Sequence, residues 1–178
     1  ASSSSRADRA SVIRVLPAIV LVVVLTGIPA MAARTPVVVV APGHDLSANS
    51  ETEPIGPGSQ AMKIKDSGGT RGVVSGLTEA ELNLAVAKRT RALLQKAGVK
   101  VVMTRTSTAG TSMGNIARAR IANRADAALF LRIHADGSTD RSARGTHTLH
   151  PALRRGWTDD VYGQSKRAAG IVQRDLRG

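Results

Sequence analysis

The chain has 178 residues, which suits one compact domain with a tail, and it carries a formal net charge of +12 at pH 7. That charge favours an anionic partner, but the basic residues are spread along the chain and only one Trp, one Tyr and one Phe are present, so specific nucleic-acid binding is not expected. Because there is no cysteine, disulfides and thiolate metal sites are excluded, and any zinc must be bound by nitrogen and oxygen atoms.

The first 32 residues have the pattern of a signal peptide. Three arginines precede an apolar run at residues 15–28, and a small-x-small cleavage sequence follows at residues 30–32. The apolar run is about 14 residues long, shorter than the roughly 20 that a membrane-spanning helix needs, although an uncleaved anchor is the alternative interpretation. We therefore predict a signal peptide at 1–32 and a secreted domain at 33–178, which meets the membrane only through the signal segment before cleavage.

The first predicted strand of this domain lies at residues 36–41. Residues 37–40 are all valine, which is typical of a central strand of a parallel sheet, buried on both faces. Pro42 and Gly43 end this strand, and His44 follows at once. From residue 45 to 76 the chain is rich in glycine, serine, proline and charge, without usable periodicity, so we predict a long loop there.

The clearest predicted helix covers residues 78–96. Leucine and valine residues recur in it at helical spacing, and Gly98 provides the stop. Thr78 and Glu81 have the spacing of a capping box, in which each side chain bonds to the backbone N–H of the other residue.

Strands and helices alternate along the rest of the chain. We predict strands at 99–104, 127–133 and 145–150, and helices at 114–124 and 159–176. Strands separated by helices require crossover connections, so the predicted class is α/β, with an open, largely parallel twisted sheet and helices on both faces.

Two histidines, His44 and His134, each follow a predicted strand directly. Ligands of open α/β sheets bind beyond the carboxyl ends of the strands, so these imidazoles can converge there on a metal ion, although a lone histidine at a strand end is more often structural. Glu79 and Glu81 lie at a nearby helix start; because Glu81 is expected to bond to the cap, we assign Glu79 as the third ligand. Two histidines and one glutamate leave a fourth position for water, as in catalytic zinc sites.

Four stretches of the sequence carry a family pattern. They are VVVVAPGH at 37–44, GLTEAELNL at 76–84, VVMTR at 101–105 and IHAD at 133–136. In this order they resemble the zinc-dependent N-acetylmuramoyl-L-alanine amidases, the peptidoglycan amidases. Arg118, Asn123 and the stretch at 145–149 also lie where that family has matching residues, so the resemblance covers residues 37–178.

The resemblance implies a site and a reaction. His44, Glu79 and His134 would bind one Zn2+ per chain, and the amide bond between N-acetylmuramic acid and the L-alanine of the peptidoglycan stem peptide would be hydrolysed. Zinc would polarise the carbonyl and lower the pKa of its water toward ~7. Peptidoglycan is then the expected partner, the cell wall the expected location, and a monomer the expected state.

The general base of the family is a glutamate on a late strand, and the sequence has no glutamate after Glu81. We therefore expect the catalytic domain to be incomplete at its C-terminus, and we predict no catalytic base in this chain. The alternatives are a non-catalytic, zinc-containing fragment that binds the cell wall and, ranked last, a zinc peptidase of related fold.

Two residues beside the predicted site depart from the family pattern. Asp45 stands where the family usually has glycine, and Arg132 stands where it has a small residue before the second histidine. Arg132 could favour an anionic substrate group or reach solvent. Asp136 could orient a ligand imidazole or stabilise a turn. These three residues are the remaining candidates for contact with a ligand or substrate.

Overall fold

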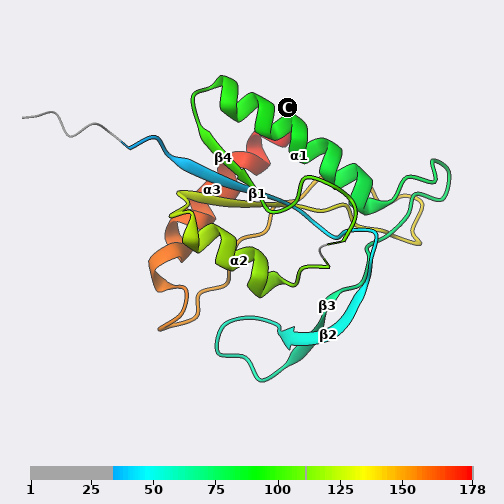
Figure 1. Ribbon diagram of the computed structural model, residues 1–178, viewed down its shortest axis with the longest axis horizontal. Helices are drawn as coiled ribbons and strands as arrows, with labels where there is room; N and C mark the ends of the chain where they lie inside the picture. Colours follow the sequence, from blue (N-terminus) through cyan, green and yellow to red (C-terminus); the bar gives the residue numbers. More distant parts are fainter. Residues whose placement is uncertain (1–33, 111, 178) are drawn as a thin grey trace, which may run out of the picture. The chain divides into compact units, whose positions relative to one another are not determined.

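The computed structural model describes residues 34–110 and 112–177. The predicted signal peptide at 1–32 lies outside the described residues. The described part of the chain forms a parallel sheet with helices packed against it, and a separate hairpin (Figure 1). None of the helices in this part combines the length and the apolar character that crossing a membrane requires.

The parallel sheet has three strands in the order β4-β1-β5. Its central strand is β1 (Val37–Pro42), which pairs with β4 (Lys100–Met103) on one side and with β5 (Leu129–Ile133) on the other. Both neighbours run parallel to β1, so the carboxyl ends of all three strands lie at one edge.

The valine run is the centre of the core. The register places Val38 between Val101 of β4 and Leu129 of β5. Val39 and Val40 are completely buried, because strand side chains alternate between the two faces and both faces of β1 are covered. This burial agrees with the prediction of a central strand at residues 36–41.

Helices flank the sheet, as the predicted α/β class requires. α1 (Glu79–Lys96) and α2 (Asn115–Arg124) both contact β1 and lie on either side of it in Figure 1. Ala87 of α1 belongs to the buried cluster formed with the valines of β1. α3 (Asp159–Leu176) begins and ends where the sequence predicted a helix, but none of its residues is buried.

The start of α1 confirms the predicted capping box. The Thr78 hydroxyl accepts a hydrogen bond from the backbone N–H of Glu81 at 3.2 Å, and the Glu81 carboxylate accepts one from the backbone N–H of Thr78 at 2.9 Å. The Glu81 carboxylate therefore caps the helix, and the Glu79 carboxylate takes no part in the capping box.

The predicted loop at 45–76 was wrong in its central part, which forms an antiparallel hairpin of β2 (Asn49–Pro54) and β3 (Met62–Asp66). The six residues of β2 include no aliphatic or aromatic side chain apart from proline, so the strand has no hydrophobic pattern to recognise. Backbone pairing and ion pairs such as Lys65 with Glu51, at 2.6 Å, hold the hairpin together instead.

The strand predicted at 145–150 was also wrong. Among the described residues this segment pairs with no strand, and it lies along α3 in an irregular conformation. The Thr148 hydroxyl donates to the carbonyl of Ala169 at 2.9 Å, and the Gln173 side chain donates to the carbonyl of Thr146 at 3.0 Å. The polar groups of this segment thus bond to α3 and not to a neighbouring strand.

The hairpin is tied to α2 by Glu53. Gly114 is the N-cap of α2 and has no side chain to cap it, so the Glu53 carboxylate accepts hydrogen bonds from the backbone N–H groups of Asn115, at 2.6 Å, and Ile116, at 3.1 Å. A Cβ at Gly114 would lie 2.4 Å from a Glu53 oxygen, so a larger residue there would displace the Glu53 carboxylate from the helix end. Burial raises the pKa of Glu53, but Lys63 and the two backbone donors together hold it below its ordinary value.

We expect Glu53→Gln to lower the free energy of unfolding by about 1–3 kcal/mol, because an amide replaces a charged acceptor of two backbone donors. The folded pKa of Glu53 is depressed, so its stabilisation is fully present above the ordinary value of 4.5 and is lost as pH falls through the folded pKa. Urea unfolding at several pH values should therefore show the difference between wild type and variant shrinking in acid. Glu51→Gln, on the same hairpin but exposed, should leave the unfolding curve nearly unchanged, because an ion pair in contact with solvent contributes little to stability.

Candidate metal centre

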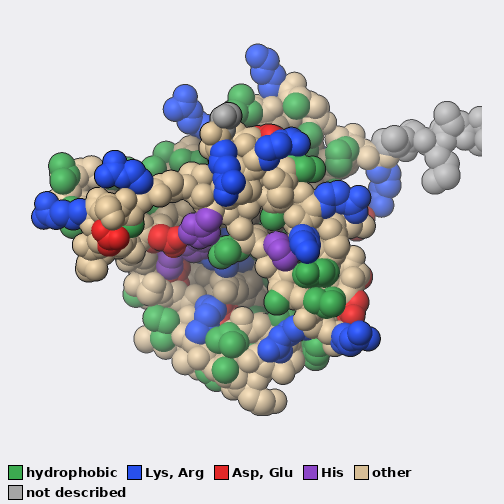
Figure 2. Space-filling view, turned by 180° about the vertical axis from the view of Figure 1, so that it is seen from behind, with side chains coloured by type: hydrophobic (Ala, Val, Ile, Leu, Met, Phe, Trp, Pro, Cys, Tyr) green, Lys and Arg blue, Asp and Glu red, His purple; other side chains and the backbone are tan. Residues whose placement is uncertain are grey.

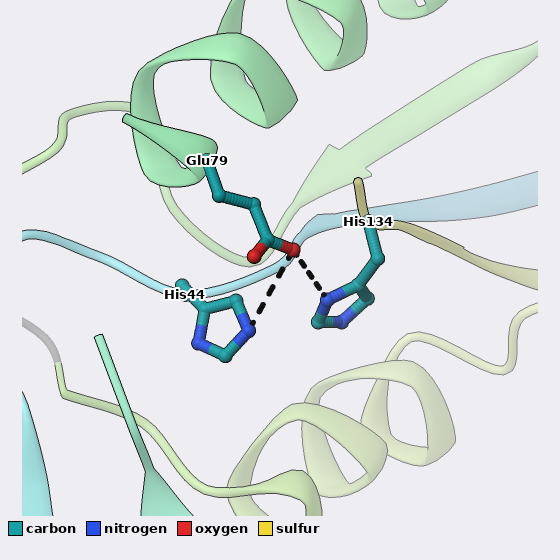
Figure 3. A group of neighbouring side chains, drawn as sticks. All are labelled: His44, Glu79 and His134. Atoms are coloured by element: carbon teal, nitrogen blue, oxygen red, sulfur yellow. Dashed lines mark hydrogen bonds and ion pairs between the residues drawn. The ribbon is translucent and has the colours of Figure 1, made fainter. Parts of the chain in front are cut away.

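The three side chains predicted as metal ligands lie together at the carboxyl edge of the sheet (Figure 3). His44 comes after β1, His134 directly follows β5, and Glu79 is the first residue of α1. One nitrogen or oxygen atom from each of them lies within 4.8 Å of the other two. His44 has a φ of 54°, a left-handed conformation in which a non-glycine residue is uncommon.

Glu79 is buried and held from several sides. One carboxylate oxygen accepts hydrogen bonds from the backbone N–H of Ala135, at 3.1 Å, and from the amide of Asn83, at 3.3 Å; the other accepts from the backbone N–H of Thr70 at 3.1 Å. Burial raises the pKa of Glu79, but these bonds and the two imidazoles outweigh it and keep the pKa below its ordinary value. The side chain is therefore ionised at neutral pH, which is the form that binds a metal.

His44 is oriented by Asp66, the last residue of β3. Its Nδ1 lies 2.5 Å from the buried Asp66 carboxylate, which also accepts the backbone N–H of Gly68 at 2.9 Å. The proton shared with Asp66 leaves the His44 Nε2 facing Glu79, 3.7 Å from its carboxylate. Sequence reasoning missed Asp66 because it fell in the predicted loop; the alternation of apolar and charged residues at 62–66 was the signal that could have revealed it.

His134 stands between a carboxylate and a guanidinium. Its Nδ1 is 3.1 Å from Glu79, and its Nε2 is 2.8 Å from a terminal nitrogen of Arg132. Burial lowers the pKa of His134 and the charge of Arg132 lowers it further, against the opposing effect of Glu79. The imidazole is therefore neutral at pH 7, as a metal ligand must be.

Two glycines leave the space that the three side chains fill. A Cβ at Gly43 would lie 2.3 Å from the His134 ring, and a Cβ at Gly69 would lie 2.9 Å from Glu79 and 3.0 Å from His44. These contacts are too short for any side chain, so the convergence of the three residues depends on glycine at both positions.

The end of β1, from which His44 emerges, is held by two buried arginines. Arg105 donates to the carbonyl of Pro42 at 3.3 Å and to the carbonyl of Gly43 at 2.9 Å. Arg118 donates to the same Pro42 carbonyl at 2.9 Å. These carbonyls lie where the strand leaves the sheet, and the guanidinium groups supply the hydrogen bonds that water would otherwise provide.

The remaining candidates lie outside the convergence. The Asp45 carboxylate is fully buried and accepts hydrogen bonds from the backbone N–H groups of Ser47, at 2.9 Å, and Ser112, so it shapes the loop after His44. Asp136 is exposed and lies 3.4 Å from His147. The carboxylate that orients a predicted ligand is thus Asp66, and Asp136 contacts a different histidine.

A cavity of about 330 Å³ opens beside the two histidines, between β3, α2 and β5. His44 and His134 form part of its wall, together with the basic side chains of Lys63, Lys65 and Arg132. Figure 2 shows a hollow on this side of the molecule with basic and histidine side chains around it.

Comparisons with known proteins show which family the chain resembles in sequence and fold. The family model for N-acetylmuramoyl-L-alanine amidase matches residues 38–177. The crystal structure of the apo form of the N-acetylmuramyl-L-alanine amidase Ami1 from Mycobacterium abscessus is similar at 27% identity and a TM-score of 0.53, over 58% of this chain and 49% of that one. Ami1 from Mycobacterium smegmatis is similar at 27% identity and a TM-score of 0.54, over 60% of this chain and 49% of that one. The chain thus spans about half the length of these structures, and no curated protein matches it.

Asp66→Asn should raise the dissociation constant for zinc about 10- to 100-fold, because the imidazole of His44 loses the carboxylate that fixes its proton and its orientation. Zinc titration against a competing chelator would measure this change. Asp136→Asn removes a carboxylate that contacts neither His44 nor His134, and it should leave zinc affinity within about twofold. Equal affinity of the Asp66 variant and wild type would show that Asp66 does not support the centre.

Proposed function

Since the chain belongs to the N-acetylmuramoyl-L-alanine amidase family, we propose that His44, Glu79 and His134 bind one zinc ion that serves hydrolysis of the amide bond between N-acetylmuramic acid and L-alanine in peptidoglycan. One observation carries this proposal: two imidazoles and one buried carboxylate offer ligand atoms within 4.8 Å of one another. Two nitrogens and one oxygen with a position left open form the donor set of a catalytic zinc site.

The residues around the three candidate ligands also fit a metal site. Asp66 holds a proton of His44 on Nδ1 and so directs the Nε2 lone pair inward. Backbone donors from Thr70 and Ala135 keep Glu79 ionised and in place. An arrangement built only for hydrogen bonding would not need both imidazoles to face the same carboxylate.

The chemistry divides between the metal and the chain. A zinc ion held here would polarise the scissile carbonyl and activate water for attack. The chain's own residues fix the ligands, and the cavity beside His44 and His134 gives a substrate peptide access to them. Arg132 adds a positive charge to the wall of that cavity, where its attraction to a negatively charged substrate group would be stronger than in bulk water.

A second candidate is binding of the cell wall without hydrolysis. Hydrolysis needs a group that carries a proton to the leaving amine. The two buried carboxylates beside the histidines, Asp66 and Glu79, are both hydrogen-bonded to them and so are engaged in holding the candidate ligands. This observation favours a zinc-containing module that holds peptidoglycan but does not cleave it.

Both candidates place the protein outside the cytoplasmic membrane, where peptidoglycan lies. The signal-peptide pattern at 1–32 and the basic composition of the chain support this location, with the domain at 33–178 as the secreted part. The anionic polymers of a cell wall would attract a chain of this charge.

Glu79→Gln and Glu81→Gln form a matched pair, because the two glutamates are two residues apart but only Glu79 faces the histidines. Wild type and Glu81→Gln should bind one equivalent of zinc by metal analysis, whereas Glu79→Gln should lose it. Glu81→Gln should leave the fold intact, because glutamine at this position also forms a capping box. Dye release from labelled sacculi, measured on the same samples, separates the two candidates: release that depends on Glu79 supports the amidase, and zinc with wall binding but no release supports the second. A wild-type chain that binds no zinc would contradict both.

Wall binding should weaken as salt is added, because attraction between exposed charges is screened over about 10 Å at 0.1 M ionic strength. Co-sedimentation with sacculi between 0.05 and 0.5 M NaCl, roughly the range in which this screening changes most, would measure the effect. Retention that does not depend on salt would indicate that shape and hydrogen bonding, not net charge, hold the protein on the wall.

A further inference from the structure

The cavity beside the histidines contains one cation that has no acidic partner. Of the basic residues in its wall, Lys63 pairs with Glu53 at 2.8 Å and Lys65 pairs with Glu51 at 2.6 Å. Arg132 differs from them, because no carboxylate of residues 34–110 or 112–177 lies within ion-pair distance of it.

The fourth cation of the wall, Arg118, is also engaged. It donates to the carbonyls of Met113, at 3.1 Å, and Pro42, at 2.9 Å, and lies 3.9 Å from Asp66. It is 1% exposed, so it supports the strand end and is not available to a ligand. Arg118 Nη2 also makes no hydrogen bond, but Arg118 has a carboxylate beside it, so among the described residues of the wall Arg132 is the cation that lacks an acidic partner.

The guanidinium of Arg132 has only neutral acceptors. One terminal nitrogen donates to the Asn115 side chain and the other to Nε2 of His134, while its buried Nε has no partner. A guanidinium has five N–H donors in a fork that matches a carboxylate, and hydrogen bonds to a carboxylate are roughly twice as strong as those to neutral groups. An anionic ligand in the cavity would satisfy Arg132 better than its present neighbours do.

The contact with His134 links Arg132 to the metal centre. Because Arg132 can only donate, Nε2 of His134 must be the acceptor, and the proton of the neutral ring is then on Nδ1, which bonds to Glu79 at 3.1 Å. Nδ1 is also the ring nitrogen on the side of Glu79 and His44 (Figure 3). A neutral imidazole that binds a metal through Nδ1 carries its proton on Nε2, where it would face an N–H of Arg132. Metal binding therefore removes one of the two acceptors of Arg132.

We propose that the cavity between β3, α2 and β5 is a carboxylate-binding site anchored by Arg132, which exchanges the imidazole of His134 for a carboxylate of an acidic peptide when the metal centre is loaded. The inference rests on the proposed function, which supplies both the metal and a peptide substrate. Metal binding breaks the hydrogen bond between Arg132 and His134, so it should raise the affinity of Arg132 for the carboxylate. A carboxylate bound to Arg132 should in turn raise the affinity for the metal, because the coupling is reciprocal.

The first test is binding of L-alanyl-D-glutamate and of its diamide to the zinc-loaded chain, measured by calorimetry. Wild type should bind the acid at least tenfold more tightly than the diamide. Arg132→Gln, which keeps a polar but shorter side chain without the charge, should lose this preference. Lys65→Gln removes a charge from the same wall that Glu51 already neutralises, and it should keep the preference. An Arg132→Gln variant that still prefers the acid would overturn the proposal, because the carboxylate would then be bound by another group.

The second test uses the metal and the imidazole directly. Arg132→Gln should bind zinc at least tenfold more tightly than wild type in a chelator competition, since the opposing donor is gone. In the metal-free protein, imidazole 15N chemical shifts should show His134 protonated on Nδ1 in wild type and redistributed toward Nε2 in the variant. Unchanged zinc affinity together with unchanged 15N shifts would overturn the link between Arg132 and His134. Failure of both proteins to bind zinc would instead contradict the metal centre itself, so the two failures are distinguishable.

Discussion

The rest of the site depends on the hydrogen bonds that two buried guanidinium groups donate to the end of β1. The carbonyls of Pro42 and Gly43 belong to buried residues at the end of β1, and Arg105 and Arg118 together donate hydrogen bonds to them. Burial lowers the pKa of both arginines, whereas the nearby carboxylates of Asp45 and Asp66 raise it. A buried charge left without a partner costs several kcal/mol, so removing any one of these four charged residues should destabilise the fold.

This network explains why His44 leaves the strand in an unusual conformation and still points in one direction. Asp66 belongs to the same group of charges as Arg118, at 3.9 Å, and at the same time fixes the His44 ring. The hairpin that carries Asp66 is in turn attached to α2 through Glu53. His44 is thus positioned by segments from three distant parts of the sequence, and its position depends on the contacts that join those segments.

Much of this could be predicted from the sequence, and the reasons differ by element. The valine run of β1 has one stable environment, a sheet covered on both faces, and the Thr78–Glu81 box has a purely local mechanism, so both predictions were confirmed. The hairpin was missed because its stability comes from pairing and charge, which leave no hydrophobic period. Asp66 was missed with it: the alternation at 62–66 could have indicated a strand, but it does not show that the carboxylate at the end of that strand reaches His44, 22 residues away. The segment at 145–150 was mistaken for a strand because its local sequence, which resembles a strand of the family, does not show that its hydrogen bonds go to α3.

Gly43 and Gly69 have a consequence for protein design. The three candidate ligands meet only because two neighbouring residues contribute no atoms beyond the backbone, so part of the site is defined by empty positions. Copying His44, Glu79 and His134 onto another parallel sheet would reproduce the donors but not the room they occupy. A transplanted centre would need both glycines, and with them the left-handed backbone at Gly69, whose φ is 75°, before its donors could approach one another at all.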